Sequence, residues 1–151
     1  AQHRATYPTF WAWRQAALDL AYVQGQLDAA YGWRIFVTEY TKATTIGNFP
    51  MQANGAEMMR IAVILAEDRG LQIVAIMHDA FLIECDEAHA ESHASALQQV
   101  MREASRSVLG DFELRSDLRT VRFPERFGPK DKQEFWNLVC QKLEECATDG
   151  T

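Results

Sequence analysis

His78 and Asp79 stand between two largely apolar segments of the chain, residues 71–77 and 80–85. This arrangement predicts a β-hairpin that carries both side chains at its tip. A carboxylate held on such a turn can bind a divalent cation, and phosphoryl transfer with two metal ions needs carboxylates a few Å apart. The structural alternative is an aspartate that caps its own turn, and the dipeptide by itself favours that alternative.

The flanking segments and the turn composition support a functional interpretation of the pair. Both segments are apolar enough to predict strands buried on both faces, which would hold Asp79 with little freedom. The turn lacks the Asn-Gly or Asp-Gly dipeptide that two-residue hairpins usually carry. An aspartate in a tight turn without glycine is more easily explained by function than by folding preference.

Two amide side chains, Asn48 and Gln52, precede the hairpin and flank Pro50. Proline is favoured in the first turn of a helix, so we expect a helix from Pro50 to about Arg69, closed by Gly70. The amides could cap this helix or be solvated. They could instead donate hydrogen bonds to the minor-groove acceptors of DNA, which every base pair presents and which do not report sequence.

The remaining pattern predicts an α+β fold with a small, mostly antiparallel sheet around the central hairpin, packed by about four helices. Asp86 is expected to cap one helix, and Gly32 and Gly110 to end two others. We expect helices at about 9–30, 50–69, 87–109 and from Asp131 onward, strands at 33–38, 71–77, 80–85 and within 112–123, and loops at 41–47 and 124–129.

Length and composition predict a single domain over residues 1–146 and a frayed tail over 147–151. The chain has 151 residues, 48% of them hydrophobic and 24% charged. It contains no run of about 18 apolar residues and no signal-peptide pattern, so we expect a cytoplasmic protein without a membrane partner. The odd number of cysteines, without metal-ligand spacing, predicts reduced thiols.

Charge is distributed unevenly along the chain, which has a net charge of −6. Acidic residues predominate over 57–99 and basic residues over 100–132. Because DNA binding needs local positive potential and not a basic whole, the composition neither supports nor excludes nucleic acid as a partner. Tryptophans could stack on bases, although core or partner contacts are the favoured interpretation; Trp11 and Trp13 cannot share one helix face.

His89 and His93 form a second candidate pair, four residues apart on one predicted helix face. Such a pair could bind a metal ion. The surroundings are polar, and Ala90 stands where a zinc protease has its general base. A solvated helix surface is therefore the favoured interpretation.

The order of these motifs resembles the C-terminal palm of family A DNA polymerases, the class of bacterial DNA polymerase I. That family has a helix that begins Asn-x-Pro-x-Gln and, beyond it, an apolar strand that ends His-Asp-Glu. Here residues 48–52 read NFPMQ and residues 76–84 read IMHDAFLIE. Upstream, Tyr7-Pro8 before a long helix and Gly32-Trp33-Arg34 are similar to the family's Tyr-Pro and Gly-Arg-Arg segments. The resemblance covers about residues 5–110.

The resemblance implies a DNA-directed DNA polymerase, a nucleotidyltransferase of DNA replication or repair, acting on primer-template DNA and deoxynucleoside triphosphates. Asp79 would be one of the metal-binding carboxylates, which hold two Mg²⁺ ions together. His78 would contact the backbone of the last primer nucleotide. Asn48 and Gln52 would face the minor groove of the new duplex, and Arg34 would also contact DNA.

Several positions depart from the family pattern. Ala80 replaces the usual Glu after the aspartate, Thr44 an Arg, Ala53 a Gly and Trp33 the first of the paired arginines. We find neither the family's Asp-x-Ser-x-x-Glu strand nor its Arg-x-x-x-Lys helix with a Tyr in these residues. We therefore expect the isolated chain to be inactive without the missing N-terminal polymerase portion. The alternative is a non-catalytic module, derived from a polymerase palm, that binds nucleic acid or protein.

Overall fold

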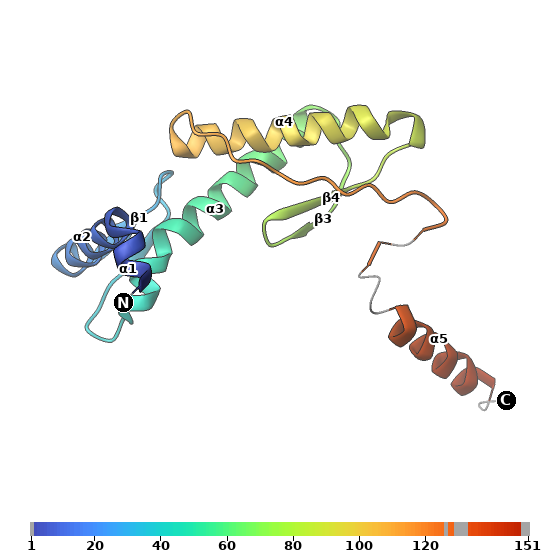
Figure 1. The fold of residues 1–151 in the computed structure, drawn as a ribbon, viewed down its shortest axis with the longest axis horizontal. Coiled ribbons are helices and arrows are strands. Elements are labelled where there is room, and N and C mark those ends of the chain that lie inside the picture. The colour runs from blue at the N-terminus through green and yellow to red at the C-terminus, as the bar shows by residue number, and fades with distance from the viewer. Residues whose placement is uncertain (1, 126, 129–132, 149–151) are drawn as a thin grey trace. The chain divides into compact units, whose positions relative to one another are not determined.

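The computed structural model describes residues 2–125, 127–128 and 133–148 (Figure 1). These residues contain five α-helices, one 3-10 helix and two separate two-stranded antiparallel sheets. The predicted α+β class is confirmed, with the strands divided between two hairpins. Residues 1–117 and 118–151 form two compact units. The single domain expected over 1–146 stays a prediction.

The first unit begins with two helices that run almost without interruption. Helix α1 spans Gln2–Thr6 and α2 spans Pro8–Gln24. Tyr7 joins them, because its amide donates to the His3 carbonyl at 3.0 Å and its carbonyl accepts from the Trp11 amide at 3.2 Å. Gly25 ends α2 in the left-handed conformation, with φ of +69°. The helix expected to reach Ala30 therefore ends earlier, and that part of the prediction was wrong.

A short hairpin follows α2. Strand β1 (Gln26–Asp28) pairs antiparallel with β2 (Arg34–Phe36), with Leu27 opposite Ile35. β2 confirms the strand expected within 33–38. β1 lies in residues that were expected to be helical, since the left-handed turn at Gly25 releases the chain from α2.

Helix α3 spans Ala43–Asp68 and begins well before Pro50 (Figure 1). The expected start at Pro50 and the expected loop over 41–47 were therefore wrong. Ile46 is fully buried and packs with Leu18 and Ala21 of α2, so tertiary burial stabilises the additional seven helical residues before Pro50. Pro50 lies inside the helix, where it cannot donate the usual hydrogen bond to the Ile46 carbonyl.

Strands β3 (Ile73–Met77) and β4 (Ala80–Ile83) form the predicted hairpin, with Met77 opposite Ala80 and only His78 and Asp79 at the turn. The expectation that both faces of these strands are buried was wrong. Val74 and Ile76 are exposed, whereas Ile73 packs against the core. A two-stranded hairpin has one face on the helices, and no further layer of the described residues covers the other face.

The main core lies between α3 and α4, which Figure 1 shows packed across each other. The 3-10 helix η1 spans Glu87–His89 and α4 spans Ala90–Leu109, ending at Gly110 as predicted. His89 is the N-cap residue of α4 and Asp86 makes no side-chain capping hydrogen bond, so the expected cap by Asp86 was wrong. Both helices contribute small side chains, which allow close packing. The buried members of this core are Ala62, Ala66, Leu71, Leu97, Val100 and Ala104.

No strand forms among the described residues after α4, so the strands expected within 112–123 were wrong. The second unit contains α5, Gln133–Thr148. The expected helix start at Asp131 lies outside the described residues, as do parts of the expected 124–129 loop and 147–151 tail. No helix in the described part of the chain combines the length and apolarity needed to cross a membrane.

Candidate functional site

The hairpin tip exposes both His78 and Asp79 to solvent. His78 has φ of +53°, in the left-handed region that β-carbon-bearing residues rarely adopt. Asp79 does not share this conformation. The paired strands hold the turn despite the unfavourable backbone at His78, which is a pattern often found at functional positions.

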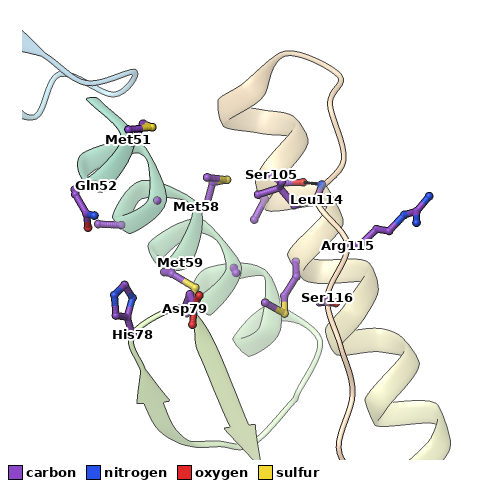
Figure 2. A pocket seen from close by; sticks show the side chains of 15 residues that line it. Met51, Gln52, Met58, Met59, His78, Asp79, Ser105, Leu114, Arg115 and Ser116 are labelled. Carbon is purple, nitrogen blue, oxygen red and sulfur yellow. Dashed lines mark hydrogen bonds between the residues drawn. The ribbon is translucent and has the colours of Figure 1, made fainter. Parts of the chain in front are cut away.

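The tip faces a pocket of about 470 Å³ between α3, α4 and the segment that follows α4 (Figure 2). Figure 2 shows Asp79 beside Met59 of α3, and His78 on the side of Gln52. The pocket is mostly apolar, with these three polar side chains toward one end. Its lining residues are Met51, Gln52, Gly55, Ala56, Met58, Met59, Ala62, His78, Asp79, Met101, Ala104, Ser105, Leu114, Arg115 and Ser116.

The far wall of the pocket is an extended segment, residues 114–116, held against α4 by side chains. The Leu114 amide donates to the Ser105 hydroxyl at 3.0 Å. The Gln98 side-chain amide donates to the Ser116 carbonyl at 2.9 Å. Figure 2 shows the Arg115 side chain extending away from the hairpin tip. Sequence reasoning missed this wall, since its residues carry no strand pairing and no motif.

The two amides predicted to face DNA occupy successive turns of α3. Both Asn48 and Gln52 are exposed, and neither side chain has a hydrogen-bond partner among the described residues. Lys42, and not Asn48, occupies the N-cap of α3, so the helix-capping interpretation of Asn48 was wrong. Gln52 lines the pocket with His78 and Asp79, whereas Asn48 does not.

Arg34 does not line this pocket, and its side chain is already paired with Asp28. Its guanidinium contacts both oxygens of Asp28 across the first hairpin, with Nε 2.6 Å from Oδ1 and Nη2 2.8 Å from Oδ2. The hydrogen bond and the positive charge lower the pKa of Asp28, and the same contacts raise the pKa of Arg34. Any phosphate contact by Arg34 has to compete with this bidentate partner. Its role in DNA binding stays a prediction.

The magnesium site that the resemblance implies needs several oxygen ligands beside Asp79. No group of three His, Cys, Asp or Glu side chains that could hold a metal ion occurs among residues 2–125, 127–128 and 133–148. Asp79 offers the hard carboxylate oxygens that Mg²⁺ prefers, but it does so alone. The described residues therefore supply one ligand and do not fit a complete two-ion site.

Comparisons with known proteins agree with the resemblance. No protein-family model matches the chain. The chain is 29% identical over 68 residues to DNA polymerase I of Aquifex aeolicus (strain VF5). The aligned segment covers 41% of this chain and 12% of that protein.

Its fold is similar to the polymerase domain of Pol1 from M. smegmatis, solved in complex with DNA primer-template and dNTP. The TM-score is 0.55 at 21% identity, over 62% of this chain and 19% of that chain. The match thus spans a small part of each relative. The resemblance to a segment of the family A DNA polymerases is confirmed.

Proposed function

We propose that this chain is the C-terminal portion of a DNA-directed DNA polymerase, in which the β3–β4 tip presents Asp79 and His78 to a primer end lying along α3. One observation carries the proposal: the tip and Gln52 of α3, far apart in sequence, line the same pocket. An acidic ligand, an imidazole and an amide donor in one place match the chemistry of a bound nucleic-acid terminus.

Each side chain has a distinct role in this proposal. Gln52 can donate its amide to purine N3 or pyrimidine O2 in the minor groove, which tests the shape of a base pair without reading its sequence. Asn48, one turn earlier on α3, can do the same for a neighbouring pair. His78 can donate a ring N–H to the sugar-phosphate backbone of the primer. Primer-template DNA and deoxynucleoside triphosphates are the proposed ligands.

Asp79 is proposed to supply one carboxylate of a divalent-metal site, with Mg²⁺ as the proposed ion. Because this chain contributes a single hard ligand, the remaining carboxylate has to come from protein outside these residues. The chain has no Asp-x-Ser-x-x-Glu motif, and its one Arg-x-x-x-Lys string, residues 126–130, comes after the hairpin and contains a proline, which does not suit a helix interior. We accordingly propose that the purified chain by itself does not extend a primer.

The test begins with the DNA upstream of the Ala1 codon. We expect it to encode the two missing motifs, in frame or in a neighbouring gene. The longer product, or the two products mixed, should extend a primer, and Asp79→Asn should lower the rate by more than about 100-fold. Asp86→Asn is the matched control, because Asp86 is exposed just beyond the same hairpin and lies away from the pocket.

Three results would overturn the proposal. Absence of the missing motifs from the surrounding genes would remove the catalytic role and favour a binding module. Primer extension by the purified chain alone, lost in Asp79→Asn, would show that the chain does not depend on another portion. Equal activity of Asp79→Asn and Asp86→Asn in the completed enzyme would remove Asp79 from the site.

A further inference from the structure

The start of the chain is basic, in contrast to the chain as a whole. Residues 2–18 contain His3, Arg4 and Arg14 and no carboxylate, although the net charge of the chain is −6. The first acidic residue, Asp19, accepts a hydrogen bond from the Gln15 amide at 2.9 Å. Residues 2–18, which form α1 and most of α2, therefore carry a net positive charge.

Aromatic rings lie among these cations in a stripe along α1 and α2. His3, Tyr7 and Trp11 follow one another at four-residue spacing, and the His3 ring contacts both of the others. The His3 ring lies 4.8 Å from Tyr7 and 5.9 Å from Trp11 between centroids. The Trp11 indole donates its N–H to His3 Nδ1 at 3.0 Å, which fixes the orientation of both rings.

Two guanidinium groups lie over the ring of Trp11. The Cζ atom of Arg4 is 4.6 Å from the ring centroid and that of Arg14 is 5.4 Å away. Cation–π contacts of this kind order the long side chains without using their N–H groups. Neither arginine is paired with a carboxylate among the described residues, so no ion pair neutralises either charge.

This basic aromatic stripe, defined as His3, Arg4, Tyr7, Trp11 and Arg14, reaches the start of α3. The Arg14 guanidinium donates to the Ala43 carbonyl at 3.5 Å. It also approaches so close to Gly47 that a β-carbon there would lie 2.6 Å from it. Asn48 is the next residue. The stripe is thus adjacent to the helix end that carries the first proposed minor-groove amide.

We propose that the basic aromatic stripe binds single-stranded nucleic acid, with the arginines on phosphates and an unpaired base stacked on Tyr7. Tyr7 is 54% exposed and keeps a ring face away from His3. Exposed rings beside ordered cations are the combination that single-strand-binding surfaces use, because every base has a π-face. If the proposed polymerase function holds, the occupant is the unpaired template strand next to Asn48; that assignment rests on the proposed function.

The experiment measures fluorescence anisotropy of a labelled oligo-dT of about 16 nucleotides with the purified chain, in low salt and without divalent cations. Arg4→Gln and Tyr7→Leu should each weaken binding about fivefold or more. Arg4→Gln should also reduce the salt dependence of log K by about 0.7, the loss of one phosphate contact. Tyr7→Phe should keep the affinity, since the ring remains.

Matched controls are available elsewhere on the chain. Tyr40→Leu removes an 86% exposed tyrosine outside the stripe, and Lys142→Gln removes one exposed positive charge on α5. Both should bind like the unaltered chain, and circular dichroism should show that all variants are folded. Equal losses of oligo-dT affinity in the control variants, or no oligo-dT binding by the unaltered chain, would overturn the proposal.

The outcome is separable from the polymerase test. Asp79→Asn should retain oligo-dT binding while it abolishes extension in the completed enzyme. Failure of single-strand binding together with normal extension would reject the stripe and leave the polymerase proposal standing. Binding that Asp79→Asn weakens as much as Arg4→Gln would place the strand at the hairpin tip, and would reject the stripe as its site.

Discussion

The backbone amide of Leu114 donates a hydrogen bond to the hydroxyl of Ser105 at 3.0 Å, and this contact attaches the pocket's far wall to α4. Ser105 is almost completely buried, and its hydroxyl donates in turn to the Arg102 carbonyl at 2.8 Å. One side chain thus links the last turns of a helix to an extended segment that forms no sheet. Ser105 and Leu114 both line the pocket that also contains Asp79.

Ser105→Ala should destabilise the chain by about 1–2 kcal/mol, because it leaves the Leu114 amide without its partner. Urea denaturation measures the loss, and hydrogen exchange at the Leu114 amide should become faster. Ser107→Ala is the matched control, since Ser107 is exposed on the same helix and its hydroxyl donates within the helix, to the Glu103 carbonyl. Equal destabilisation by both variants would contradict this role for Ser105.

Glycine substitutions at the two tip residues should act in opposite directions on stability. His78 has φ of +53°, where a β-carbon is unfavourable, so His78→Gly should leave stability unchanged or raise it by up to about 1 kcal/mol. Asp79 has no such strain, so Asp79→Gly should lower stability by about 0.5–1 kcal/mol through added unfolded-state entropy. Denaturation midpoints of the two variants give the comparison. A loss of stability in His78→Gly larger than in Asp79→Gly would show that the histidine side chain itself holds the turn.

The Asp28–Arg34 pair should make stability depend on pH in the acidic range. Pairing lowers the pKa of Asp28 in the folded chain. Its stabilising contribution is therefore fully present above the unfolded value of about 4 and is lost as pH falls through the lower folded pKa. Thermal melting of Asp28→Asn should be below that of the unaltered chain at pH 7, and the difference should shrink toward pH 2. A constant difference over that range would contradict the assignment; the effect is small, since both side chains are partly exposed.

The same pair provides a test of Arg34 as a DNA ligand. Asp28→Asn removes the competing carboxylate, so DNA affinity should rise several-fold if the freed guanidinium reaches a phosphate. Arg34→Gln should lower the affinity of the Asp28→Asn background back to that of the unaltered chain. Both affinities can be measured with a labelled primer-template in low salt. No change in either variant would remove Arg34 from the DNA contacts.

The local elements that the sequence predicts well are those with strong local signals. The hairpin at 78–79 follows from two apolar segments around a two-residue turn, and α4 follows from its buried stripe of Leu97, Val100 and Ala104 between Asp86 and Gly110. The family resemblance came from the same signals, since it depends on the order of short motifs.

The errors occurred where distant contacts outweigh local preference. The seven residues of α3 before Pro50 depend on burial of Ile46 against α2, and no local signal in 41–47 indicates them. The stretch 112–123 alternates like a strand, yet side-chain contacts to α4 hold its first part and no neighbouring strand pairs with it.

The sequence by itself determined which side chains are candidates for chemistry: a carboxylate and an imidazole on a turn, amides around a proline, and arginines among aromatic rings. Only the tertiary structure decided which of these act together. Packing of α3 against α4 and the hairpin brings Gln52 to His78 and Asp79, the α2–α3 contact brings Arg14 to Gly47, and the first hairpin pairs Arg34 with Asp28. The physical reason is that side-chain identity is a local property, whereas proximity between distant segments depends on how their apolar faces are buried together.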